Sequence, residues 1–141
     1  MKKTVRENIK TPYSLHDMRV DSFEIRRDQL IMHLATGMIR TGAPGGQPDG
    51  LVEFHRVCWE FSYAYLLQYQ GLAGNTGPFR GEKLFLRDFL QRFPDPVYTI
   101  LDETYGYHQT KYSGFLHTDD GIGECMLEIC HDGDMIFVSQ E

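Results

Sequence analysis

The stretch VYTILDETYGYHQTKYSGFLHTDDGIGECMLEICHDGDMIFVS, residues 97–139, decides the fold. Apolar and polar side chains alternate along four runs, which acidic or glycine-rich turns separate: 97–101, 105–117, 123–131 and 134–139. Such alternation is typical of strands with one buried and one exposed face. The four runs therefore predict an antiparallel meander.

The clearest turn in this stretch is Asp132-Gly133, a dipeptide favoured in two-residue hairpin loops. Counting outward from it places Ile129 opposite Ile136, so that the hairpin has an apolar face. The last two runs are thus expected to pair with each other.

Residues 16–36 predict a second hairpin. With Asp28-Gln29 as a two-residue loop, Phe23 and Ile25 share a face with three later apolar residues, Leu30, Met32 and Leu34. The opposite face is mostly polar, as a half-buried hairpin requires. Asp-Gln is not a favoured turn pair, so a loop one residue longer is the alternative.

Residues 51–65 are dense in β-branched and aromatic types and predict a strand. The parity of the apolar residues shifts around His55-Arg56, which indicates a bulge or bend; a strand that turns into a short helix near Ser62 is the alternative. Glycine-rich stretches at 41–50 and 71–81 predict loops on either side.

Residues 82–93 predict the one amphipathic helix. Polar residues lie largely on one side of this helix, and on the other side the apolar residues recur at helical spacing, namely Leu86, Phe89, Leu90 and Phe93. Glu82 and Arg92 stand at the ends that the helix dipole favours, and Pro94 stops the helix.

These elements predict a mainly β protein. A chain of 141 residues with 18 aromatics (Phe 9, Tyr 8, Trp 1) has enough apolar surface for one buried core. We expect an antiparallel sandwich or partly closed barrel of about seven to nine strands with one helix at 82–93. We expect a single domain over 1–141 with a flexible N-terminal arm over about 1–12, and a homodimer that covers the edge strands.

The net charge of −6 is unevenly placed, since residues 101–141 carry one basic and nine acidic side chains. Only the N-terminal Lys2, Lys3, Arg6 and Lys10 could face a phosphate backbone, and a solvated arm explains them, so we expect no nucleic-acid partner. No run is apolar and long enough for a membrane helix. Three cysteines and the absence of a secretory pattern predict a cytoplasmic protein of bacterial type.

No catalytic motif stands out. The donors of a possible metal cluster, spread from His108 to Asp134, lack metal-ligand spacing, and the serines lie in no nucleophile elbow. The paired carboxylates Asp102-Glu103 and Asp119-Asp120 are read as solvated turns. We therefore expect no catalytic residue, no metal site and no cofactor.

Tyrosines give the only candidate ligand site. Tyr105 and Tyr107 share a strand parity, and further aromatic and imidazole groups follow in the next run, so a ligand-binding face is predicted from Tyr105, Tyr107, His108, Tyr112 and His117. The alternative is a sheet face packed on the helix or on another strand.

The residues Tyr13-Ser14-Leu15-His16-Asp17, followed by the hairpin, resemble the start of small uncharacterised bacterial β-rich proteins, some of which are grouped with toxin-immunity proteins. The resemblance implies a β-rich cytoplasmic protein that acts by binding. His16-Asp17 would either fix the entry of the first strand or contact a partner.

Three hypotheses on function follow. The first is a non-enzymatic binding protein of immunity type, whose acidic last third binds a basic protein partner. The second is a small-molecule-binding sandwich or barrel that uses the tyrosine face. The third is a metal-dependent hydrolase at the cluster between His108 and Asp134.

Overall fold

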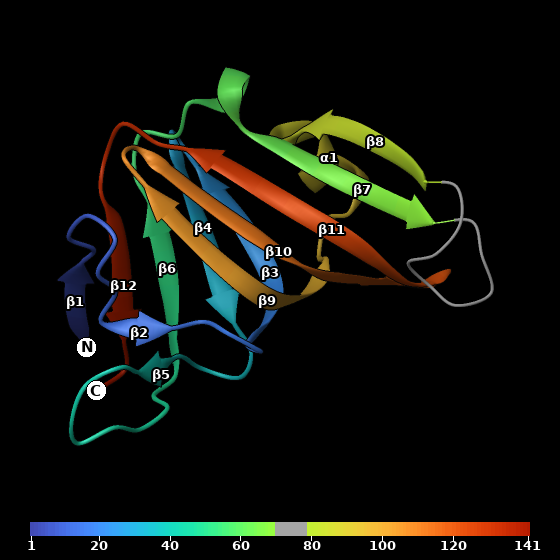
Figure 1. The fold of residues 1–141 in the computed structure, drawn as a ribbon. Coiled ribbons are helices and arrows are strands. Elements are labelled where there is room, and N and C mark those ends of the chain that lie inside the picture. The colour runs from blue at the N-terminus through green and yellow to red at the C-terminus, as the bar shows by residue number, and fades with distance from the viewer. Residues whose placement is uncertain (70–78) are drawn as a thin grey trace.

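A computed structural model describes residues 1–69 and 79–141. In this part the chain forms twelve β-strands, a short 3-10 helix and one α-helix (Figure 1). The strands are β1 (Lys2–Val5), β2 (Tyr13–Ser14), β3 (Arg19–Arg26), β4 (Gln29–Leu34), β5 (Ile39–Arg40), β6 (Gly50–Phe54), β7 (Tyr63–Tyr69), β8 (Phe79–Phe85), β9 (Val97–Gly106), β10 (Gln109–Thr118), β11 (Gly121–Cys130) and β12 (Met135–Ser139). The helices are η1 (Trp59–Phe61) and α1 (Leu86–Arg92).

Ten strands form one antiparallel sheet in the order β1-β12-β6-β4-β3-β9-β10-β11-β7-β8. Its two halves join where β3 and β9 pair over only two positions, Arg19↔Thr99 and Val20↔Tyr98. There the sheet folds over, and β9 and β10 cross in front of β6 and β4 (Figure 1). The mainly β fold with one helix is confirmed, with more strands than expected.

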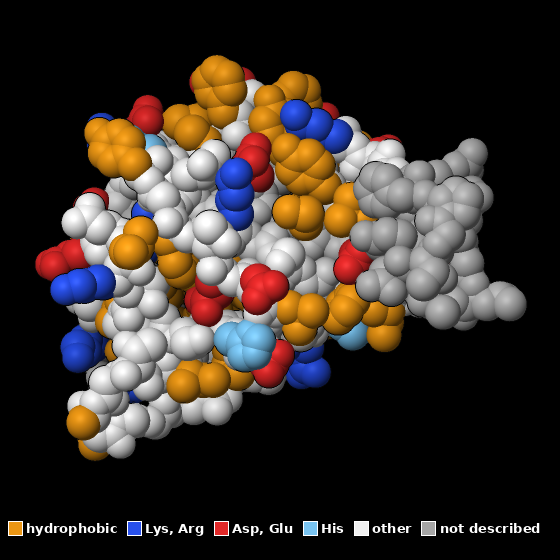
Figure 2. Space-filling view, in the orientation of Figure 1, with side chains coloured by type: hydrophobic (Ala, Val, Ile, Leu, Met, Phe, Trp, Pro, Cys, Tyr) orange, Lys and Arg blue, Asp and Glu red, His pale blue; other side chains and the backbone are white. Residues whose placement is uncertain are grey.

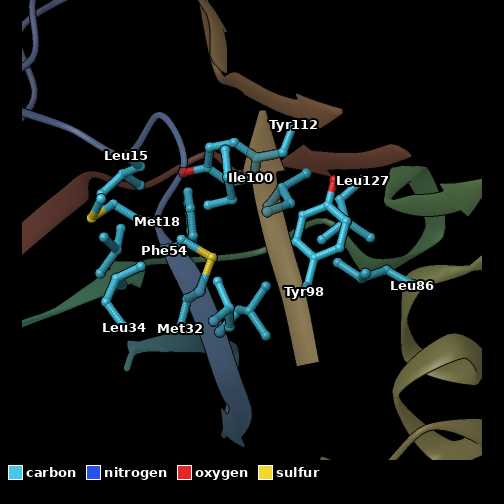
Figure 3. Packing of buried hydrophobic residues seen from close by; sticks show 14 of the residues in the cluster. Leu15, Met18, Met32, Leu34, Phe54, Leu86, Tyr98, Ile100, Tyr112 and Leu127 are labelled. Atoms are coloured by element: carbon cyan, nitrogen blue, oxygen red, sulfur yellow. The ribbon is translucent and has the colours of Figure 1, made fainter. Parts of the chain in front are cut away.

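The core lies between the two halves and is extended by the helix. Met32 and Phe54 come from one half and Ile100 from the other, and Leu86 of α1 packs into the same cluster (Figure 3). α1 also buries Phe89 and Leu90, two of the residues whose spacing predicted it. Each such side chain contributes about 1.5–3 kcal/mol when fully buried.

The helix is shorter than predicted. It begins at Leu86, because the residues from Phe79 to Phe85 pair with β7 and satisfy their backbone groups in the sheet. Glu82 is therefore not in the first helical turn; its carboxylate instead accepts hydrogen bonds from the Arg92 guanidinium at 2.8 and 3.0 Å. The predicted loop at 71–81 lies mostly outside the described residues.

The predicted hairpin at Asp132-Gly133 is wrong. β11 pairs with β10 and β7, whereas β12 pairs with β1 and β6 in the other half of the sheet. The amide groups of Asp132 and Gly133 donate to the carbonyls of Arg56 and His55, at 2.9 and 3.0 Å. The turn thus carries the chain from one half of the sheet to the other.

The first hairpin is confirmed with a shifted loop. Arg26 pairs with Gln29, so the loop is Arg27-Asp28, with Arg27 in the left-handed region at φ 59°. Each β3 residue therefore pairs with a β4 residue two positions earlier than predicted, so that Ile25 is opposite Leu30. A shift of two residues leaves the same side chains on the same face.

The predicted strand at 51–65 is two strands, not one strand with a bulge or bend, and the short helix that was the alternative lies between them. β6 ends at Phe54, Arg56 takes a φ of 48°, η1 follows, and β7 begins at Tyr63 on the other side of the molecule. The loop predicted at 41–50 has no regular structure before Gly50.

Candidate functional site

The five predicted ligand-binding residues do not form one face. Tyr105 and Tyr112 point into the sandwich, with ring centroids 6.3 Å apart at 88°. Tyr107 and His108 occupy the β9–β10 turn, where Tyr107 is 90% exposed. His117 lies on the outward side of β10, and its Nε2 is 3.2 Å from Thr99 Oγ1. The residues therefore separate into an inner pair, a turn and an outer position.

Tyr105 and Tyr112 belong to a larger group, which we call the inner polar cluster. Its members come from the segment after β1, from β9, from β10 and from the β11–β12 connection, and they meet between the two halves of the sheet. The cluster comprises Arg6, Glu103, Tyr105, Thr110, Tyr112 and His131.

Arg6 links the N-terminal segment to the β9–β10 hairpin. Its guanidinium donates to the carbonyl of Gly106 at 2.9 Å and, through Nη1, to Thr110 Oγ1 at 3.3 Å, and it lies over the Tyr105 ring at 4.9 Å. Burial lowers the pKa of Arg6 below its ordinary value. The first residues were expected to be a flexible arm, but Lys2–Val5 pair with β12, and this strand positions Arg6.

Thr110 and His131 continue the hydrogen bonds that begin at Arg6. Since His131 Nδ1 lies 2.9 Å from the Gly133 carbonyl, it must donate, and Nε2 then accepts from the Thr110 hydroxyl at 3.0 Å. Burial lowers the pKa of His131, and the positive charge of Arg6 contributes to the shift. The arrangement therefore holds His131 as the neutral ring.

Glu103 occupies the other side of the cluster. Its carboxylate accepts from the Tyr105 hydroxyl at 2.7 Å, the Leu15 amide at 2.9 Å and the Ser14 hydroxyl at 3.1 Å. The predicted turn at Asp102-Glu103 is thus wrong, because both residues lie inside β9. Its shared parity with Tyr105 was the one sequence signal that could have identified Glu103; for Arg6 the sequence offers none.

Tyr112 is the least satisfied member of the cluster. Its hydroxyl is buried and has no hydrogen-bond partner among the described residues. Burial raises the pKa of Tyr112. The pKa of Tyr105 is also raised, mainly by burial and next by the neighbouring Tyr112. Both phenols therefore stay protonated at neutral pH, and neither is suited to act as a base.

The motif at residues 13–17 docks on the irregular part of β9. The β9–β10 register skips Leu101, because Asp102 pairs with Ser113 and Ile100 with Gly114. The Leu101 carbonyl contacts His16 Nδ1, and the amide of Asp17 donates to Ile100 at 2.7 Å. These contacts fix the chain before β3, the first of the two roles expected for His16-Asp17.

The acidic and metal-ligating residues of the last third are dispersed. Asp119 and Asp120 lie in the β10–β11 turn, whereas Asp132 and Asp134 lie beyond the other end of β11. Among the described residues, no three His, Cys, Asp or Glu side chains are grouped to hold a metal ion. Over residues 1–69 and 79–141, no helix is long and apolar enough to cross a membrane.

An exposed aromatic surface lies on the outside of β7 and β8, where Figure 2 shows hydrophobic side chains gathered beside basic ones. We call it the outer aromatic face; it comprises Tyr63, Tyr65, Phe85 and Met126, and we include with them the exposed Phe61 of η1, which precedes Tyr63 by two residues. The Tyr63 and Phe85 rings stack at 5.5 Å, and Lys83 Nζ lies 4.0 Å from the Tyr63 ring centroid. Phe61 and Phe85 are 60% and 49% exposed.

The shared parity of Tyr63 and Tyr65 indicates this face in the sequence. Phe85 was assigned to the helix, so the stacked pair was not predicted. The chain matches no family model, and neither the curated proteins nor the solved structures contain a match to it.

Proposed function

We propose that this protein is a non-enzymatic binding protein whose outer aromatic face takes a protein partner. The observation that carries the proposal is the exposure of Phe61 and Phe85 next to the stacked Tyr63. Aromatic side chains that are rigid and accessible are the groups that dominate protein interfaces. Lys83 and the Lys111–Glu128 ion pair, at 3.4 Å, supply polar contacts within and beside the same face.

The inner polar cluster supports a ligand site less well. The Tyr105 hydroxyl is occupied by Glu103, Arg6 is occupied by the β9–β10 hairpin, and Tyr112 is buried. A basic partner of the kind expected for an immunity-type protein would need a continuous acidic surface, whereas Asp119-Asp120 and Asp132 lie at opposite ends of β11. We therefore propose a partner that presents apolar side chains to the aromatic rings.

A differential capture experiment tests this function. Three tagged forms serve as bait: the wild-type protein, the double variant Phe61→Ser/Phe85→Ser, and a control double variant Ile9→Ser/Ile25→Ser. The control residues are 72% and 40% exposed and lie in the other half of the sheet, Ile9 in the turn after β1 and Ile25 on β3. Quantitative mass spectrometry should find a protein that is enriched on the wild type and the control and reduced at least about tenfold on the aromatic variant.

Unfolding curves of the three forms establish that all are folded. If every captured protein is retained equally by the aromatic variant, the outer aromatic face is not the binding surface and the proposal is refuted.

A further inference from the structure

Cys58 and Cys130 lie opposite each other in two antiparallel segments. Val57 and His131 form a bridge between the chain before η1 and the end of β11, so the next residues face each other. The Cys58 amide donates to the Cys130 carbonyl at 2.8 Å. Opposite residues of this kind place their side chains on the same face, with Cα atoms about 5.5 Å apart.

The Ser62 hydroxyl completes the pairing. It accepts from the Cys130 amide at 3.0 Å and donates to the Cys58 carbonyl at 2.9 Å, in place of a second direct backbone bond. Ser62 is fully buried, so this bridge is shielded from water and holds both backbones in position.

The two thiols are free and partly accessible, whereas the third cysteine, Cys125, is buried. Burial, the adjacent Cys130 thiol and the carboxylate of Asp132 raise the pKa of Cys58 to about 11. A disulfide requires Cα atoms about 4.4–6.8 Å apart, a range that includes the spacing of opposite residues in an antiparallel pair.

We propose that Cys58 and Cys130 form an oxidation site at which a peroxide joins them in an intramolecular disulfide. One sulfur, as thiolate, attacks a peroxide oxygen and breaks the O–O bond, which gives a sulfenic acid and a hydroxide, and the hydroxide takes up the proton that the thiol has lost to give one water. The second sulfur displaces the hydroxyl group from the sulfenic sulfur, and the released hydroxide takes up a proton to give a second water. Two thiols lose two electrons and two protons, and one hydrogen peroxide becomes two waters.

The cross-link would tie η1 to β11. η1 leads directly into β7, so oxidation fixes the corner from which the outer aromatic face begins. The inference concerns the thiols alone and does not depend on the proposed binding function.

Peptide mapping tests the site. The reduced full-length protein is treated with hydrogen peroxide at pH 8.5, remaining thiols are alkylated, and the digest is analysed without reduction. We expect a peptide pair that joins Cys58 to Cys130 and has lost two hydrogen atoms, in a protein that stays free of intermolecular disulfides. The Cys125→Ser variant should give the same cross-link, and Cys130→Ser should give none.

Oxidation should also raise the melting temperature of the wild type and of Cys125→Ser by about 5–15 °C, and leave that of Cys130→Ser unchanged. Full alkylation of both cysteines after peroxide, separate overoxidation of each, or links only between chains would overturn the proposal. The wild-type map decides even if a variant does not fold.

Discussion

Replacing Gly114 with alanine should strongly destabilise the protein, because the β9 backbone occupies the space that a side chain would need. A Cβ built at Gly114 would lie 1.9 Å from the Thr99 carbonyl oxygen and 3.2 Å from the Ile100 Cα. Relief requires the two strands to separate, since none of these atoms belongs to a flexible side chain.

The expected cost follows from two contributions. Overpacking in a tight interior costs about 1–3 kcal/mol, and each backbone hydrogen bond weakened by the separation adds about 0.5–1.5 kcal/mol. We therefore expect the free energy of unfolding to fall by about 2–5 kcal/mol. Gly106 and Gly123 are matched controls, because a Cβ at either would meet nothing within 4 Å. Their alanine variants should lie within about 0.5 kcal/mol of the wild type or be slightly more stable.

Urea unfolding followed by Trp59 fluorescence and circular dichroism measures all three variants. A Gly114→Ala protein that fails to fold while both controls fold is the extreme of the expected loss. A Gly114→Ala variant as stable as Gly123→Ala would refute the register between β9 and β10, and with it the position of Leu101 and the docking of His16.

Three further predictions concern the polar groups of the interior. The free energy of unfolding should fall as the pH drops below about 6.5, because His131 binds a proton in the unfolded chain at a higher pH than in the folded one. Burial, Arg6 and His108 lower the pKa of the folded residue. Urea titrations between pH 5 and 8 should show that the free energy of unfolding depends less on pH in His131→Gln than in the wild type. Arg6→Met should lose about 1.5–3 kcal/mol in urea unfolding, whereas the exposed Arg26→Met should stay within about 0.5 kcal/mol. Ser62→Ala should lose about 1–3 kcal/mol by the same assay, since the Cys130 amide and the Cys58 carbonyl each lose the Ser62 hydroxyl.

The predictable part of the fold is the part that depends on local periodicity. Alternation along residues 97–131 predicts that this stretch is β-strand, and the spacing of Leu86, Phe89 and Leu90 predicts α1. The turn between the first two runs was predicted at 102–104, but it lies at Tyr107-His108, between β9 and β10. The partner of a strand depends on long-range contacts that periodicity does not encode. Asp132-Gly133 has the composition of a hairpin loop, yet its amides bond to the chain at His55-Arg56, and β12 pairs with β6.

The candidate sites illustrate the same limit. Strand parity predicted that Tyr105 and Tyr107 share a face, but β9 ends at Gly106 and Tyr107 is exposed in the turn. Of the five predicted residues, Tyr105 and Tyr112 are the two that meet inside the molecule. Arg6 comes from about 100 residues away in the chain, and its contact with Gly106 depends on the pairing of β1 with β12. The stacking of Tyr63 on Phe85 requires that Phe85 be in strand β8. The helical spacing within residues 82–93 led instead to the prediction that Phe85 is in the helix.

The division between inner and outer groups bears directly on function. A group that acts on a ligand must have donors or acceptors left over after the fold is satisfied. Inside the sandwich, Arg6 donates to Gly106, Glu103 accepts from Ser14, and the His131 ring donates to Gly133. Burial of Tyr105 keeps its phenol protonated. On the outer aromatic face the rings contact one another and a lysine, and their free surfaces face solvent. Removing Arg6 should therefore change stability, whereas removing Phe61 should change binding, and this separation distinguishes a structural cluster from a functional surface.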